Sequence, residues 1–170
     1  MYLKHAVGAA VALLLMIGTT ASSVRAAGDP NCQTVAGKGV WTLIPSADPL
    51  GRVLGPTTGS LKASMSATLK SLTPNPNGSL AATSEEVWVL GPQDVITFDG
   101  VATFTPIPDA PIGTVSDALT LTVASGTGQY AGATGTINVT GTGYNVFGPA
   151  AGPGSTFFDI RYRGTICTVN

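Results

Sequence analysis

Two adjacent carboxylates, Glu85 and Glu86, are the side chains of this chain best suited to acid–base chemistry. They precede the apolar run Val87–Leu90, and successive side chains of a strand point to opposite faces. Glu86 would therefore share a face with Trp88 and Leu90, where burial would raise its pKa and let it give or take a proton. Glu86 is a candidate catalytic residue on this basis. A charge at the rim of the fold beside a turn is the simpler interpretation, and it is the one we expect.

A second charged group, Asp159, Arg161 and Arg163, occupies alternate positions near the end of the chain. Alternate residues of a strand share one face. We expect a ladder of charges that faces the solvent. The other interpretation is a site for an anionic head group at the mouth of the fold.

Aromatic side chains are spread along the chain and offer stacking surfaces for a flat ligand. We expect most of them to pack in the core or at its rim, with ligand binding as their second role. Tyr130 is in addition a candidate catalytic acid or base. The candidate ligand-binding residues are Trp88, Phe98, Phe104, Tyr130 and Tyr162.

The first 26 residues have the features of a secretory signal peptide. A short basic start with Lys4 leads into the apolar or small run 6–18, and the segment ends in a small-residue cleavage pattern at Ala26. The run is shorter than the roughly 20 residues that a membrane span needs. We expect cleavage after Ala26, a mature domain of residues 27–170 in a secreted or periplasmic location, and no membrane span.

Removal of this leader takes away the only histidine, His5. The mature chain then lacks the residues for a Ser-His-Asp site, a Cys-His site or a histidine-bound metal, so we expect neither a metal nor a cofactor. It keeps six basic and nine acidic residues without basic runs, which argues against nucleic acid as a partner. The glycines from Gly126 onwards lie between expected strands and lack the following helix of a phosphate-binding loop.

Cys32 and Cys167 lie near the two ends of the mature chain. In an exported protein an even pair of cysteines usually forms a disulfide, and that bond requires Cα atoms within about 7 Å of each other. Two free or metal-binding thiols are the alternative, but zinc would need further ligands. We expect the disulfide, which would place the first and last elements side by side.

Alternation of apolar and polar side chains dominates the chain after residue 30. Clear cases are the run Leu61–Leu69 and the final segment, where Phe158, Ile160 and Tyr162 share a face. Segments rich in Gly, Pro and Asn separate about seven or eight such strands. Long antiparallel strands in one small domain form a sandwich or a barrel, and a disulfide between the terminal strands favours a closed or nearly closed barrel.

The segment Val95–Phe104 contains an Asp99-Gly100 pair that could form a hairpin turn. A hairpin would leave both faces mixed, whereas one continuous strand places Ile96 and Phe98 on a single apolar face. We therefore expect one strand with a bend or bulge at Gly100.

The segment 122–143 reads TVASGTGQYAGATGTINVTGTG, and its spacing suggests a turn after a strand at 118–124, with Tyr130 opening the next strand. It resembles the hairpin of the allene oxide cyclase-like barrels, relatives of the dirigent proteins, in which a strand is followed by G-x-G-x-[FY]-x-G-A-x-G. The closing segment 157–167, FFDIRYRGTIC, resembles the last strand of exported members. The matching residues of the hairpin are Gly126, Gly128, Tyr130, Gly132, Ala133 and Gly135.

The resemblance implies an eight-stranded, calycin-like barrel with an apolar lumen open at one end. The lumen would hold a small apolar or aromatic molecule. The protein would then be a binding protein, which we favour, or a cyclase- or dirigent-like isomerase that steers a spontaneous reaction. A structural or surface-interaction protein with a filled barrel is the third alternative. A cavity above roughly 300 Å³ would favour the first two functions, and a core packed solid by aromatic side chains would favour the third.

Overall fold

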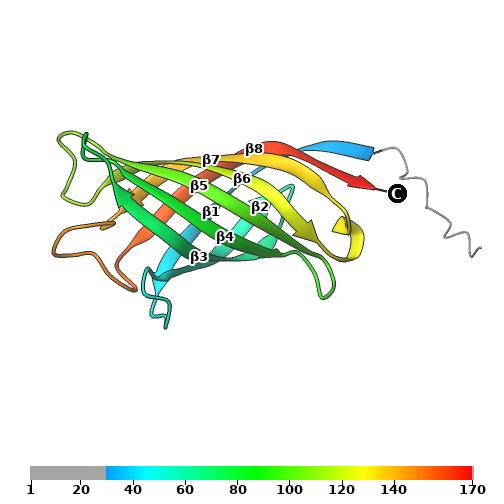
Figure 1. Cartoon of the computed structure of the whole chain (residues 1–170), viewed down its shortest axis with the longest axis horizontal. Coiled ribbons are helices and arrows are strands. Elements are labelled where there is room, and N and C mark those ends of the chain that lie inside the picture. Colours follow the sequence, from blue (N-terminus) through cyan, green and yellow to red (C-terminus); the bar gives the residue numbers. More distant parts are fainter. Residues whose placement is uncertain (1–29, 170) are drawn as a thin grey trace, which may run out of the picture.

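A computed structural model describes residues 30–169, so the expected signal peptide lies outside the described residues. Eight strands run antiparallel to their neighbours in sequence order, and the last pairs with the first to close a barrel (Figure 1). The expected closed all-β barrel is therefore confirmed. The elements are β1 (Pro30–Ile44), β2 (Arg52–Gly59), β3 (Ala63–Pro74), β4 (Leu80–Val89), β5 (Val95–Pro106), β6 (Val115–Gly126), the 3₁₀ helix η1 (Gly128–Tyr130), β7 (Thr134–Tyr144) and β8 (Phe157–Val169).

Alternating side chains explain why these segments form the wall of a barrel. In β3, Ala63, Met65 and Ala67 are buried on the inner face, while the serines and lysine between and beyond them are more exposed. β8 repeats this pattern with Ile160 and Tyr162 inside. Removal of each inner set from water stabilises the fold by about 25 cal/mol per Å² of apolar surface, and only a strand places such a set on one face.

The strand β5 is continuous, as expected, and Ile96 and Phe98 are completely buried on its inner face. The expected bulge at Gly100 is wrong. The irregularity in pairing lies between Thr97 and Phe98, against β6. Gly100 instead faces the lumen, where the Ser84 hydroxyl of the neighbouring strand occupies the space that a Cβ atom would need.

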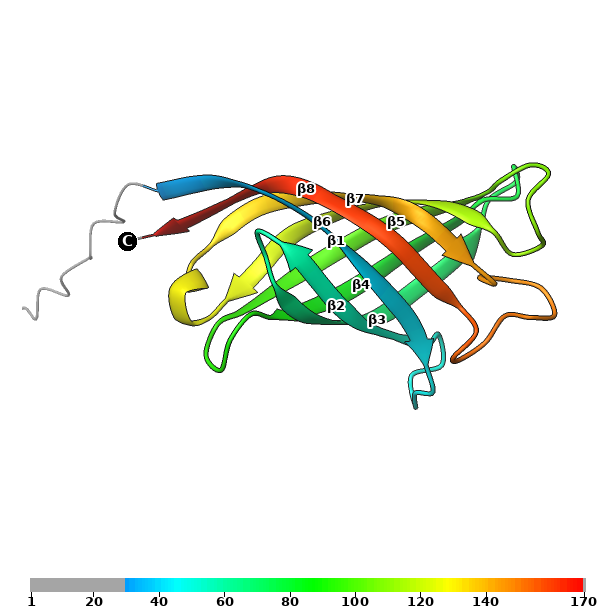
Figure 2. The ribbon, with the colours of Figure 1, turned by 180° about the vertical axis from the view of Figure 1, so that it is seen from behind.

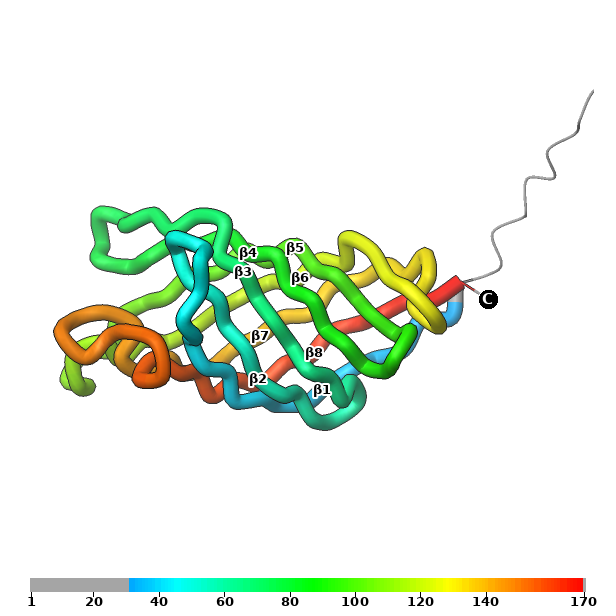
Figure 3. Tube along the Cα trace, turned by 90° about the horizontal axis from the view of Figure 1, so that it is seen from below, coloured from blue at the N-terminus to red at the C-terminus, as the bar shows by residue number. Residues whose placement is uncertain are grey.

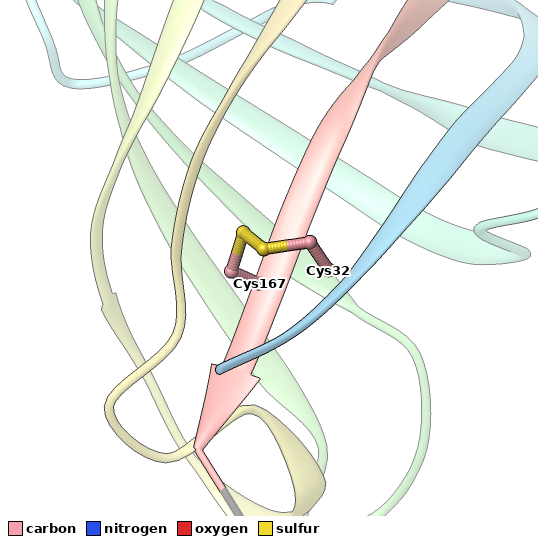
Figure 4. The surroundings of a disulfide bond; sticks show 2 residues. All are labelled: Cys32 and Cys167. Atoms are coloured by element: carbon pink, nitrogen blue, oxygen red, sulfur yellow. A yellow bond between two sulfur atoms is a disulfide. The ribbon is translucent and has the colours of Figure 1, made fainter. Parts of the chain in front are cut away.

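Closure of the barrel depends on the pairing of β1 with β8, which is unbroken from Pro30–Val169 to Thr42–Phe157. Figure 2 shows β1 between β8 and β2 along the wall of the barrel. Cys32 lies directly opposite Cys167 in this pairing, with a Cα–Cα distance of 3.9 Å, and the two form the expected disulfide (Figure 4). This bond fits an oxidising compartment.

The two ends of the barrel differ. The connections 45–51, 75–79, 107–114 and 145–156 gather at one end, which we call the long-loop end (Figures 1 and 3). The first and last described residues lie at the opposite end, which we call the terminal end, together with the connections 60–62, 90–94 and 127–133. Among residues 30–169, no helix has the length and apolar character to cross a membrane.

The glycine-rich connection after β6 differs from the expected turn. Tyr130 does not open the next strand but ends the 3₁₀ helix η1, and β7 begins only at Thr134. Gly128 adopts a positive φ of 58°, and the carboxylate of Asp94 accepts the N–H of Gln129 at 3.0 Å. This contact ties the connection to the neighbouring loop at the terminal end, so a helical turn replaces the start of a strand.

Aromatic side chains fill the half of the lumen next to the terminal end. The ring of Trp88 meets those of Phe98 and Tyr162 edge to face, at centroid distances of 5.4 and 5.3 Å, and we call these three residues the aromatic plug. The Tyr162 hydroxyl accepts the N–H of Leu61 at 2.9 Å and lies 2.9 Å from the Thr58 carbonyl oxygen, to which it donates. The plug is thereby fastened to the connection between β2 and β3.

Replacement of both cysteines, Cys32→Ser with Cys167→Ser, tests how much the disulfide contributes to the closed barrel. The bond joins residues separated by 135 positions, and the chain-entropy relation then gives a loss of about 4–5 kcal/mol in the free energy of unfolding. Urea unfolding followed by tryptophan fluorescence measures this loss. A loss under about 1 kcal/mol would contradict the prediction.

Candidate binding pocket in the barrel lumen

The half of the lumen next to the long-loop end is hollow. A cavity of about 140 Å³ lies there, beyond the aromatic plug. Its volume is below the roughly 300 Å³ of typical small-molecule sites, so the barrel is neither filled throughout nor as open as expected. Apolar side chains from several strands form its walls, among them Leu43, Val53, Ala67, Leu69, Ala82 and Leu119.

Three aromatic rings also line this cavity. The rings of Phe104 and Phe158 lie 5.8 Å apart between centroids, and Trp41 faces the plug residue Trp88 at 6.3 Å, edge to face. The Trp41 ring fits because position 55 is a glycine: a Cβ atom at Gly55 would lie 2.7 Å from the Trp41 ring. The indole nitrogen of Trp41 is buried, and no acceptor for it lies within the described residues.

Glu86 lies at the deep side of the cavity, next to the plug. Its side chain is 2 % exposed, and its Oε2 atom accepts the indole N–H of Trp88 at 3.0 Å. Burial raises its pKa from 4.5 to about 7; the hydrogen bond from Trp88 opposes this rise, and repulsion from Asp117 adds to it. The expectation that Glu86 lies at the rim is therefore wrong, because its position on β4 carries it well inside the wall.

Glu85, the neighbour of Glu86, points outward as strand geometry requires. Its carboxylate lies 3.6 Å from the Lys70 ammonium, and both side chains are about half exposed. Such a surface pair contributes little to stability. The adjacent glutamates thus have opposite environments, and only Glu86 belongs to the pocket.

Asp117 is a second acidic residue of the cavity. It lies near the long-loop end of β6, is 5 % exposed, and its Oδ1 atom is buried without a hydrogen-bond partner among residues 30–169. Burial raises its pKa from 3.8 to about 7. Asp117 was not among the expected site residues, although a signal was present: it shares the inner face of its strand with Val115, Leu119 and Leu121.

No basic side chain of the described part of the chain enters the lumen to balance these acids. Asp159, Arg161 and Arg163 are all exposed on the outer face of β8. The expected solvent-facing ladder of charges is therefore confirmed. The exposed basic residues are Lys38, Arg52, Lys62, Lys70, Arg161 and Arg163.

The aromatic residues expected to bind a ligand fall into three places. Phe104 lines the cavity. Trp88, Phe98 and Tyr162 form the plug and do not line the cavity, although Trp88 holds Glu86 in position. Tyr130 is buried at the terminal end, in η1, away from the pocket. The structure thus brings together Phe104 and the catalytic candidate Glu86, and separates both from Tyr130.

This arrangement provides two carboxyl groups that can exchange protons near neutral pH. The other lining residues are apolar or aromatic except for Ser84 and Thr156, and Trp41 adds a buried indole N–H. Over residues 30–169, no three His, Cys, Asp or Glu side chains are grouped so as to hold a metal ion. No family model, curated protein or solved structure matches the chain. The pocket itself is therefore the basis for any functional conclusion.

The two raised pKa values predict how stability depends on pH. Glu86 and Asp117 stay protonated in the folded chain up to about pH 7, while in the unfolded chain they ionise near their usual values. Their contribution to stability is fully present below about pH 4 and is lost as the pH rises through about 7. The melting temperature should therefore fall between about pH 4 and pH 8.

The variant Glu86→Gln removes part of this pH dependence while it keeps an acceptor for the Trp88 indole. At about pH 8 we expect it to be more stable than the wild type by up to about 3 kcal/mol, and at about pH 4 to be equal. Thermal unfolding across this range measures both values. Glu85→Gln, the exposed neighbour, is the matched control and should follow the wild type. A wild-type stability that does not fall with rising pH would contradict this account.

Proposed function

We propose that this protein binds a small, largely apolar molecule in the cavity at the long-loop end of its barrel. The observation that carries the proposal is the division of the lumen into a packed half and a hollow half. Apolar cores are normally packed without voids of this size. Here an apolar pocket of about 140 Å³ is left at one end of the lumen, and a ligand that buried its apolar surface there would stabilise the complex.

The volume sets the size of the ligand. An apolar protein cavity of about 150 Å³ holds benzene, so a cavity of about 140 Å³ suits a single ring or a short branched chain. This is smaller than the drug-sized molecules of typical binding clefts. The apolar walls and the aromatic rings of Trp41, Phe104 and Phe158 favour an aromatic or branched aliphatic body.

Entry of the ligand would take place at the long-loop end. Leu50 and Leu72 line the pocket and are 38 % and 41 % exposed, so they connect it to the surface of the protein. The plug residues on the opposite side are almost completely buried. The resemblance of the sequence to allene oxide cyclase-like barrels, which implies an apolar lumen open at one end, is consistent with entry from one end only.

We also propose that the protein acts outside the cytoplasm, after removal of residues 1–26. The disulfide Cys32–Cys167 supports this proposal because such bonds persist in oxidising compartments. The leader pattern in the sequence supports it independently.

A second candidate function is catalysis by proton transfer, of the isomerase or cyclase type. The observation in its favour is the pair of buried carboxyl groups, Glu86 and Asp117, whose pKa values of about 7 suit general acid and base catalysis near neutral pH. Turnover of a bound molecule would distinguish this function from binding alone.

Benzyl alcohol is a suitable probe of the proposed binding, because its single ring matches the cavity. We expect saturable binding to the wild-type protein by calorimetry, and a higher melting temperature in its presence. Ala82→Phe places a ring inside the cavity and should abolish binding. Thr83→Phe places the same ring on the exposed outer face of β4 and should leave binding intact. Failure of the wild type to bind any single-ring probe of this size, or equal binding to Ala82→Phe, would contradict the proposal.

A further inference from the structure

We propose that the molecule held in this cavity carries a protonated amine, which the carboxyl groups of Glu86 and Asp117 recognise. This inference rests on the proposed binding function and specifies the chemical class of the ligand. It depends on the unpartnered Oδ1 atom of Asp117, on the hydrogen bond from Trp88 that orients Glu86, on the placement of charge in the barrel, and on the aromatic walls.

Asp117 provides the first argument. Its carboxyl group is buried, its Oδ1 atom has no hydrogen-bond partner among the described residues, and the group lines the cavity. Buried polar atoms of folded proteins nearly always have a partner, and one that lacks it needs an explanation. A hydrogen-bond donor on a ligand is the explanation that the position of Asp117 at the pocket favours.

Glu86 provides the second argument. The Trp88 indole donates to its Oε2 atom at 3.0 Å and fixes the orientation of the carboxyl group at the cavity wall. Because an indole N–H can only donate, this bond favours the ionised form of Glu86 over the protonated form. The plug thus supports a negative charge that is otherwise expensive to bury.

The charges around the cavity provide the third argument. The ionisable side chains that line the cavity are Glu86 from β4 and Asp117 from β6. The strands β1, β2, β3, β5 and β8 contribute apolar and aromatic residues. Thr156, which precedes β8, contributes a hydroxyl group. Every Lys and Arg of residues 30–169 is exposed on the outside. Buried carboxylates are normally paired with a cation, and residues 30–169 do not provide one. An ammonium group on the ligand would complete the pair.

The aromatic walls provide the fourth argument. Trp41, Phe104 and Phe158 all line the same small volume as the two acids. The face of an aromatic ring attracts a cation, and more strongly when both are removed from water. A site that combines carboxylates with ring faces is suited to an ammonium group attached to an apolar body.

Neutral and anionic ligands fit this site less well. An anion would meet two groups of its own sign without a compensating cation. A neutral acceptor, such as a carbonyl, could accept the unpaired indole N–H of Trp41. It would still leave both acids without a partner once they lose their protons as the pH rises above about 7. An amine becomes a better partner over the same pH range, because it remains protonated while the acids ionise.

Three probes of nearly equal shape test the inference: benzylamine, benzyl alcohol and benzoate, which are cationic, neutral and anionic near neutral pH. We expect calorimetry at about pH 8 to show benzylamine binding about tenfold more tightly than benzyl alcohol, and benzoate most weakly of the three. The affinity for benzylamine should rise about tenfold between about pH 5 and pH 8, while that for benzyl alcohol should not rise.

The double variant Glu86→Gln/Asp117→Asn keeps the size of both side chains and removes both charges. It should lose the tenfold preference for benzylamine and retain binding of benzyl alcohol. The matched control is Glu85→Gln/Asp99→Asn, which makes the same two changes on a pair of facing, exposed residues of β4 and β5. This control should keep the wild-type preference, and urea unfolding checks that both double variants fold.

The possible results distinguish the inference about the amine from the proposed binding function. A preference for benzylamine that only the lumen variant loses would support the inference. Binding of benzyl alcohol as tight as that of benzylamine would overturn the inference and leave the proposed binding function intact. Failure of all three probes to bind the folded wild type would overturn both. A preference that the outer control also loses would assign it to surface charge and overturn the inference.

Discussion

The rest of the structure depends on the pairing of the first strand with the last. An open sheet of the same eight strands would have two unpaired edges and no interior, whereas the uninterrupted ladder between β1 and β8 creates a lumen. The disulfide between Cys32 and Cys167 covalently joins this ladder near its terminal end. The side chains of the lumen, including the two acids, are buried only because the pairing of β1 with β8 closes the barrel.

The two halves of the lumen differ: one stabilises the fold, and the other forms the proposed binding site. The packed half contributes interlocked aromatic rings and the anchored hydroxyl of Tyr162. The hollow half contains the open pocket and the buried acids Glu86 and Asp117, which lower the stability of the fold near neutral pH. Features that weaken a fold in this way are common at functional sites, which is why we assign the function to the hollow half.

Much of the fold could be predicted from the sequence, because side-chain alternation is a local property. The inner faces of β3, β5 and β8 follow directly from it. The depth of a residue does not, since it depends on strand tilt and register in the closed barrel. For this reason Glu86 was expected at the rim and lies deep inside, and the same pattern could not show that Phe104 lines the cavity while Phe98 belongs to the plug. Asp117 was detectable, because it interrupts an apolar inner face.

The aromatic plug determines how a small molecule could move through the barrel. Because Trp88, Phe98 and Tyr162 pack across the terminal half, the lumen is closed at that end and is not a channel through the barrel. A ligand of the proposed site would leave by the opening through which it entered, so the barrel would hold and release a molecule without passing it from one end to the other. The residence time of the ligand would then depend on the loops around the opening at the long-loop end.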